Sequence, residues 1–188
     1  MLPVNYSEIS NIAEYELERP AYREAMMALK DRRRVRVGDH LTFLFENRDT
    51  VRYQVQEMMR IERIVREHDI RHELESYNEL IPGPAELSAC LLIEYETPEL
   101  RGVWLRELLG LENHVWMRTP GHEPVRGRFD TRQISTDRIS SVQYVKFPLG
   151  ASAAAFGPGA RLFADHPKYT VSVSLDEARA AELRLDLA

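Results

Sequence analysis

The tripeptide Pro82-Gly83-Pro84 divides the chain into two parts that have different hydrophobic periods. Two prolines around a glycine exclude regular structure, because proline fixes φ, has no amide proton and disfavours a helical preceding residue. Before this tripeptide apolar residues recur at helical spacing, and from Leu87 the apolar runs resemble strands. Helices followed by strands are typical of an α+β fold. We therefore expect N-terminal helices packed on a mainly antiparallel β-sheet, with two further helices, in a single domain over residues 1–188.

The N-terminal part is expected to contain helices on either side of one strand. Pro20 should break or restart the first helical stretch. The sequence HLTFLFE, residues 40–46, predicts a short buried strand that follows a turn. A long amphipathic helix should then begin near Asp49 or Thr50 and reach about His68.

The C-terminal part is expected to alternate strands with two helices. Thr97 as N-cap, Pro98 at the first helical position and Gly110 as the stop predict the first of these helices. Ser174 and Glu177 have capping-box spacing for the second. The expected strands are LSACLLIEYE (87–96), a hairpin over 114–129 turning at Pro120-Gly121, ISSVQYVKFPL (139–149), and RLFADHPKYTVSVSL (161–175) with an interruption at His166-Pro167.

The long helix is predicted to carry two polar groups on its apolar side. At about 100° per residue, Glu62 falls roughly 20° from Val51, and Gln54 lies beside Met58. An ionised carboxylate on that face costs several kcal/mol unless it is paired, and Arg66 stands one turn later. Glu62 is therefore either half of a structural ion pair or a carboxylate held in a cavity as a ligand or acid/base group. The apolar stripe comprises Val51, Val55, Met58, Ile61 and Val65, and the solvent face comprises Gln56, Arg60, Arg63 and Glu67.

The single cysteine and the net charge limit the classes of function. Cys90 cannot form an internal disulfide, nor can this chain alone supply a cysteine-ligated zinc or iron–sulfur site. With 25 basic and 30 acidic residues the net charge is −5, which argues against nucleic-acid or membrane-surface binding. We expect neither a membrane span nor a signal peptide, and therefore a cytoplasmic protein.

Two histidines at helical spacing are a weak candidate metal site. His68 and His72 in HDIRH imitate the zinc-protease pattern H-E-x-x-H, but Asp69 replaces the glutamate and is one methylene shorter. The segment is also highly charged and lies at an expected helix end, where solvated histidines are common.

A basic cluster in KDRRRVR is a candidate anion-binding site, with Arg32, Arg33, Arg34 and Arg36 as its arginines. The alternative is a solvated helix end whose positive charge complements the helix dipole. The acidic chain around the cluster favours this second interpretation.

His166 stands between Asp165 and Pro167, which holds the preceding backbone extended. It is either a ligand or general base, or a side chain packed at a strand end. Cys90 lies in an apolar strand and is expected to be inert.

The chain resembles the bacterial domain-of-unknown-function family 3501 over nearly its whole length. The stretches that carry this resemblance are RRRVRVGDHLTFLFENRDTVRYQVQEMMRIERI, ELESYNELIPGPAELSACLLIEYE, SSVQYVKFPL and DHPKYTVSV. The family has no assigned activity. Genes of this family are often neighbours of genes for rubrerythrin-like proteins and for iron–sulfur proteins of the heterodisulfide-reductase type. This gene neighbourhood implies, by association, a partner or maturation role in peroxide or iron redox chemistry.

The resemblance carries over a set of polar positions. In relatives the position of Gln143 is often histidine, so a metal site that used it would be incomplete here. We expect polar residues of the long helix to point toward the sheet and to meet His40, Glu46 or His166 in one polar pocket, since buried polar groups need partners. The helix residues of this candidate pocket are Gln54, Glu57, Arg60 and Glu62. The positions carried over are His40, Glu46, Gln54, Glu57, Arg60, Glu62, Tyr77, Asn78 and His166.

Three functions are consistent with the sequence. The first is an accessory or interaction protein, without enzymatic activity of its own, for an iron-dependent redox partner that is rubrerythrin-like or an iron–sulfur protein. The second is a metal-dependent or acid/base enzyme with a Glu/His pocket. The third is a small-anion or nucleotide-binding protein. No cofactor is predicted, although iron or zinc would suit the second function.

Overall fold

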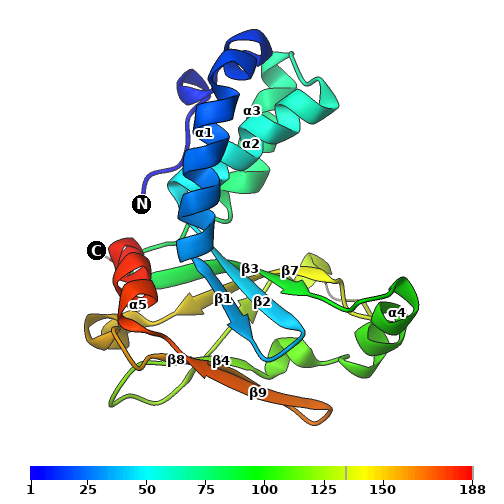
Figure 1. The fold of residues 1–188 in the computed structure, drawn as a ribbon, viewed down its shortest axis with the longest axis vertical. Coiled ribbons are helices and arrows are strands. Elements are labelled where there is room, and N and C mark those ends of the chain that lie inside the picture. Colours follow the sequence, from blue (N-terminus) through cyan, green and yellow to red (C-terminus); the bar gives the residue numbers. More distant parts are fainter. Residues whose placement is uncertain (134, 188) are drawn as a thin grey trace.

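The N-terminal helices stand as a lobe on a body that contains two antiparallel sheets (Figure 1). The computed structural model describes residues 1–133 and 135–187. The α-helices are α1 (Ile12–Arg32), α2 (Arg48–Glu62), α3 (Glu67–Asn78), α4 (Pro98–Glu107) and α5 (Glu177–Arg184). Short 3₁₀ segments are η1 (Tyr6–Glu8), η2 (Leu111–Asn113), η3 (Thr131–Gln133), η4 (Gly150–Ala155) and η5 (Leu185–Leu187).

The strands form one five-stranded and one four-stranded sheet. Their orders are β1-β2-β3-β7-β6 and β5-β4-β8-β9, and every strand pair is antiparallel. The predicted α+β class is confirmed. The strands are β1 (Arg34–Val37), β2 (Leu41–Glu46), β3 (Glu86–Ile93), β4 (Val115–Arg118), β5 (Val125–Arg126), β6 (Arg128–Phe129), β7 (Val142–Pro148), β8 (Arg161–His166) and β9 (Tyr169–Ser174).

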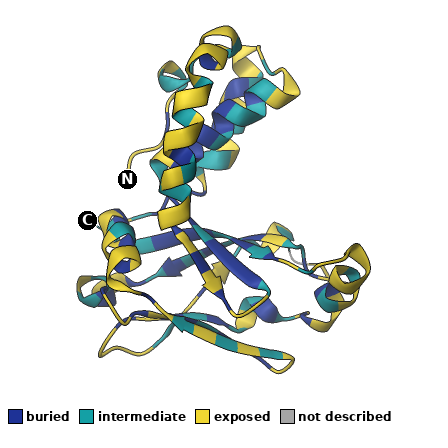
Figure 2. Ribbon diagram, in the orientation of Figure 1, coloured by how far each residue is buried: buried dark blue, intermediate teal, exposed yellow. Residues whose placement is uncertain are grey.

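The main hydrophobic core lies between the two sheets. Because successive side chains of a strand point to opposite faces, Leu87, Ala89 and Leu91 of β3 face this core while Ser88 and Cys90 face outward. Figure 2 shows the buried residues concentrated along the strands and on the inner sides of the helices. The outer faces of both sheets are therefore left for other contacts.

The helical lobe has a second, smaller core, and α2 is shorter than the sequence predicted. The buried side of α2 carries Val51, Val55 and Met59, which pack with residues of α3. The helix ends at Glu62 because Arg63 adopts a left-handed conformation with φ 56°. The expected apolar stripe is wrong at Ile61, in the last turn of α2, and at Val65, beyond the helix, which are 61% and 72% exposed.

Several predicted helix boundaries are corrected by the structure. Pro20 lies inside the continuous helix α1, on its exposed side, where water can satisfy the carbonyl that proline leaves without a partner. The N-cap of α2 is Asn47, whose side chain accepts hydrogen bonds from the amides of Asp49 and Thr50. Thr97 caps α4 as predicted, whereas Asp176 rather than Ser174 caps α5. Within the described ranges, none of the helices is long and apolar enough to cross a membrane.

A fully buried arginine connects the N-terminal helices to the C-terminal end of the chain. Arg33 donates through Nε to the Phe45 carbonyl at 2.9 Å and through Nη1 to Glu182 at 3.2 Å, and it forms an ion pair with Asp186. Its side chain has no exposed surface. A buried guanidinium is tolerated only with such a complete set of acceptors.

We predict that Arg33→Ala lowers the free energy of unfolding by about 3–5 kcal/mol, because it leaves Asp186 buried without its cation. Arg34→Ala, one residue later and exposed, should change it by less than about 0.5 kcal/mol. Urea denaturation of both variants measures the difference. A loss of under about 1 kcal/mol in Arg33→Ala would contradict a structural role for this ion pair.

Candidate functional site

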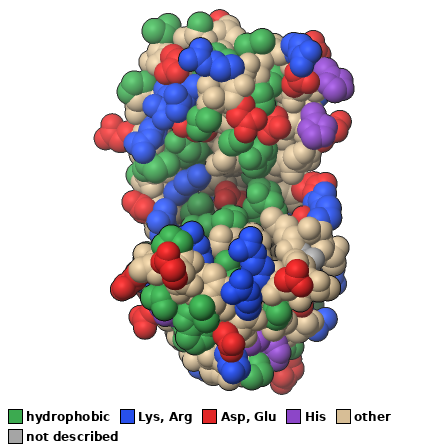
Figure 3. Space-filling view, turned by 90° about the vertical axis from the view of Figure 1, so that its right-hand side faces the viewer, with side chains coloured by type: hydrophobic (Ala, Val, Ile, Leu, Met, Phe, Trp, Pro, Cys, Tyr) green, Lys and Arg blue, Asp and Glu red, His purple; other side chains and the backbone are tan. Residues whose placement is uncertain are grey.

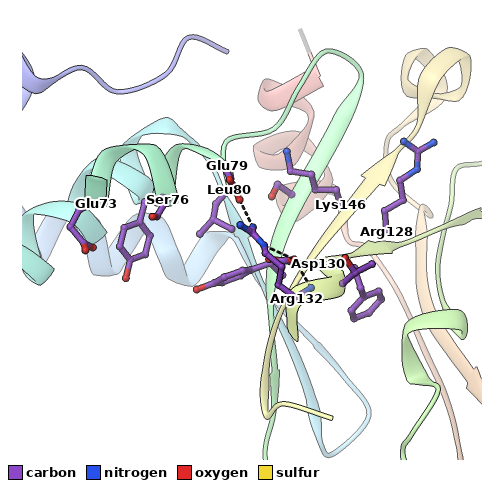
Figure 4. Close-up of a pocket in the computed structure, with 13 residues that line it drawn as sticks. Glu73, Ser76, Glu79, Leu80, Arg128, Asp130, Arg132 and Lys146 are labelled. Carbon is purple, nitrogen blue, oxygen red and sulfur yellow. Dashed lines mark hydrogen bonds and ion pairs between the residues drawn. The ribbon is translucent and has the colours of Figure 1, made fainter. Parts of the chain in front are cut away.

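A pocket of about 720 Å³ lies where the helical lobe meets the outer face of the five-stranded sheet. Side chains of α3 form one wall, and those of β6, η3 and β7 form the other. Figure 3 shows the molecular surface hollowed between the lobe and the body, and Figure 4 shows the lining side chains. This volume lies within the range of about 300–1,000 Å³ that is common for small-ligand sites.

One row of outward-facing side chains crosses the sheet beneath the pocket. Glu46 of β2 pairs with Ser88 of β3, Ser88 pairs with Lys146 of β7, and Lys146 pairs with Arg128 of β6. Directly opposed residues of antiparallel strands have Cβ atoms about 4.5–5.5 Å apart. The register therefore places the two residues side by side on the same face of the sheet, and both side chains extend from that face (Figure 4).

The two cations differ in how they are neutralised. The Lys146 ammonium lies 3.1 Å from the Glu86 carboxylate. Arg128, in contrast, has no carboxylate oxygen within 4 Å among the residues that the structure describes. Its guanidinium is therefore the cation of this pair whose charge no carboxylate of the described residues compensates.

A third cation, Arg132, closes one side of the pocket and is already neutralised. It pairs with Asp130 at 2.9 Å and with Glu79, which follows α3 (Figure 4). The hydrogen bond from Arg132 holds the pKa of the Asp130 carboxyl below its ordinary value. These contacts connect the helical lobe to η3 at one side of the pocket.

Two tyrosines belong to the neutral part of the lining. Burial raises the pKa values of Tyr77 and Tyr144, so both hydroxyls stay protonated at neutral pH and can donate hydrogen bonds. Cys90, the cross-strand neighbour of Tyr144, is also partly buried. Burial raises the pKa of its thiol to about 12, so little thiolate exists near pH 7.

The structure does not bring the expected Glu/His set into one pocket. His40 and Glu46 flank opposite ends of β2. His40 stacks on Tyr95 with ring centroids 4.1 Å apart. His166 lies in the other sheet, where Nε2 donates to the Leu109 carbonyl at 3.1 Å and Nδ1 accepts from the Lys168 amide at 3.2 Å. Both of its ring nitrogens are therefore occupied by backbone groups.

The polar residues of α2 point in different directions. Glu57 faces α1, where it accepts hydrogen bonds from Tyr15 and from Arg19, both at 2.7 Å. Arg60 lies 3.7 Å from the same carboxylate. Glu62 is exposed at the helix end, so the expected inward carboxylate is wrong because α2 stops there. Gln56, which was expected in solvent, is buried. Its side-chain amide donates to the Ser10 carbonyl and accepts a hydrogen bond from the Ser10 amide.

Tyr77 is the member of the expected set that lines the pocket, and Gln54 of α2 lies near its hydroxyl. Glu46 belongs to the row beneath the pocket but is 8% exposed. Asn78 does not line the pocket and instead binds the Val4 backbone. Gln143 is on the inner face of β7, where its amide donates to the Ser140 carbonyl at 3.2 Å.

The arginine cluster is dispersed by the fold. Arg33 is hydrogen-bonded to internal acceptors, and Arg32 pairs with Glu182 at 3.0 Å. Arg34 and Arg36 are exposed residues of β1, which the sequence interpretation assigned to a helix end. The four guanidinium groups therefore do not converge on one anion site.

His68 and His72 are exposed in the first half of α3. The neighbour of His68 is Asp69, at 3.3 Å. Across residues 1–133 and 135–187, no group of three or more His, Cys, Asp and Glu side chains is placed to hold a metal ion.

Sequence reasoning missed Arg128, Arg132, Tyr144 and Lys146. The alternation of VQYVKF does place Tyr144 and Lys146 on one face of a strand. The pairing of Lys146 with Arg128 depends on the strand register, which the chain alone does not show.

The chain matches a family model and is similar to a solved structure along nearly its whole length. The family described as "Protein of unknown function (DUF3501)" matches residues 3–187. A crystal structure at 1.90 Å of a novel protein of unknown function from Burkholderia pseudomallei K96243 is 34% identical, covers 100% of both chains and has a TM-score of 0.91. No curated protein matches the chain.

We predict that Glu57 stabilises the fold in a pH-dependent way. The hydrogen bond from Arg19 is the main reason that the pKa of Glu57 lies below its ordinary value of 4.5. A depressed pKa means that the stabilisation is present above about pH 4.5 and is lost as the pH falls through the folded-state pKa. Glu57→Gln should therefore cost about 1–2 kcal/mol at pH 7 and much less at pH 3, in urea denaturation.

The matched control is Glu62→Gln, an exposed carboxylate of the same helix, which should have little effect at either pH. An equal cost of Glu57→Gln at both pH values would show that the carboxylate charge is not what stabilises the contact.

Proposed function

The chain belongs to the DUF3501 family of proteins of unknown function, and on that premise we propose that it is a binding protein for a small anion. The site is the pocket between α3 and β6–η3–β7. Arg128 and Lys146 are the anion-binding cations, and Tyr77 and Tyr144 are neutral donors beside them.

The observation that carries this proposal is the direct opposition of Arg128 and Lys146 across β6 and β7. Like charges opposite each other on neighbouring strands destabilise a sheet. An anion between them converts this repulsion into two charge-assisted contacts, which are stronger than neutral hydrogen bonds. The Ser88 hydroxyl, next in the same row, is a further donor.

The lining indicates the chemical class of the ligand. A planar guanidinium recognises carboxylate and phosphate groups in a bidentate manner, and an ammonium serves as a point charge. The pocket is larger than a bare anion needs, and its other walls include Leu80 and two tyrosine rings. We therefore propose an organic carboxylate or phosphate whose uncharged part lies against these residues.

The other expected functions have different support. A Glu/His enzyme is less well supported, because His40, Glu57 and His166 lie in three separate places. An accessory role for an iron-dependent redox partner, rubrerythrin-like or iron–sulfur, rests on the family resemblance. We propose it as the wider setting, in the cytoplasm, and co-purification with such proteins tests it.

Inorganic phosphate and citrate, each titrated at constant ionic strength, should raise the unfolding temperature of the protein. At about 100 times the dissociation constant a bound anion adds about 2.7 kcal/mol to the unfolding free energy. Arg128→Gln and Lys146→Gln should each remove most of this stabilisation, because each deletes one charged contact. Differential scanning fluorimetry measures the shift.

The control is Arg101→Gln, which removes the same charge from an exposed position of α4 and should retain the full shift. Equal stabilisation of the parent protein and both pocket variants would mean that the salts act generally on the protein surface, and the proposed site would be wrong.

A further inference from the structure

The outer face of the four-stranded sheet carries two aromatic rings that lie side by side. Trp116 of β4 is paired with Phe163 of β8, and their neighbours in each strand point into the core. The ring centroids are 6.4 Å apart and the ring planes differ by 17°. Both side chains are partly exposed, so the pair forms a small flat platform on the side of the body away from the helical lobe.

Three arginines surround this platform. Arg126 of β5 is the cross-strand partner of Trp116, and Arg118 is opposite Arg161 in the next outward row. The guanidinium carbons of Arg118 and Arg161 lie 5.9 and 5.8 Å from the centre of the Phe163 ring. In the described part of the chain, none of the three has a carboxylate oxygen within 4 Å.

The carboxylate next to the platform is already occupied. Asp165 accepts hydrogen bonds from Trp116 Nε1 at 2.9 Å and from His114 Nδ1 at 3.0 Å. Desolvation opposes ionisation, but these two hydrogen bonds keep the pKa of Asp165 below its ordinary value. Asp165 therefore fixes the orientation of the indole ring, while the arginines keep an excess of positive charge over the rings.

We propose that this face binds single-stranded nucleic acid. Exposed aromatic rings on an antiparallel sheet stack with unpaired bases, and arginines beside them neutralise the phosphates and stack on bases themselves. A duplex offers no free base face to Trp116 and Phe163, so the platform favours single strands. The opposition of Arg118 and Arg161 is relieved by a phosphate, as like charges across strands otherwise repel.

The net charge of −5 argues against broad nucleic-acid binding by the whole chain. The local distribution differs, because the one carboxylate beside the platform is already hydrogen-bonded and its three arginines have no carboxylate partner among the described residues. Arg161 and Arg126 donate only to neutral side chains, to Ser172 at 2.7 Å and to Asn113 at 3.4 Å. This proposal uses none of the residues of the anion pocket and stands independently of that function.

Fluorescence anisotropy with a labelled oligothymidylate of about 12 nucleotides, and with the matching oligouridylate, tests the proposal. We expect saturable binding of at least one of them at low salt and weaker binding of a duplex of equal length. Trp116→Ala and Phe163→Ala should each weaken binding about 10-fold, through lost stacking. Circular dichroism shows whether each variant is folded.

The arginines are tested by the salt dependence of binding, which does not require the aromatic variants to fold. The slope of log K against log salt concentration should become shallower by about 0.7 for each of Arg118→Gln and Arg161→Gln. Arg101→Gln, which removes an exposed charge from α4, should have the same slope as the parent protein. A shallower slope in both platform variants supports the proposal.

Three results would overturn the proposal. The first is no anisotropy change with either oligonucleotide at about 100 μM protein and low salt, and the second is duplex binding as tight as single-strand binding. The third is that Trp116→Ala and Phe163→Ala are folded and bind as tightly as the parent protein.

Discussion

The structure depends on the alternation of side chains along the central strands β3 and β7. One set of alternate residues, including Leu87, Ala89 and Val145, fills the core between the two sheets. The other set, including Ser88 and Lys146, is turned outward toward the helical lobe. Because the side-chain period of a strand is two, a slip of one residue would exchange the two sets. The core thus specifies the register, and the register places Lys146 opposite Arg128.

The chain crosses from the four-stranded sheet to the five-stranded sheet at one glycine, with an arginine on each side of it. Gly127 separates β5 from β6, and a Cβ atom at this position would lie 2.6 Å from Val145 Cγ2. Arg126 on one side of it belongs to the aromatic platform, and Arg128 on the other side belongs to the pocket. A single short segment therefore supplies an arginine to each of the two proposed binding surfaces.

The sequence predicted the local elements that depend on neighbouring residues. These include the hairpin at Pro120-Gly121 and the Thr97 cap, each of which has a short-range physical cause. The α+β class followed from the change of hydrophobic period along the chain. It did not predict the break at Arg63, where a non-glycine residue adopts a left-handed conformation that only the tertiary structure justifies. Nor did it predict the row Glu46–Ser88–Lys146–Arg128, since that row joins four strands by pairings that are distant in sequence.

The central claim is that the register of β6 and β7 creates an anion site between Arg128 and Lys146. A crystal structure of the protein grown with citrate would test it most directly. The account predicts a carboxylate group of the ligand within hydrogen-bond distance, about 2.7–3.2 Å, of both the Arg128 guanidinium and the Lys146 ammonium. A well-ordered structure at saturating citrate, in which the pocket holds no anion and Arg128 turns away to another carboxylate, would contradict it.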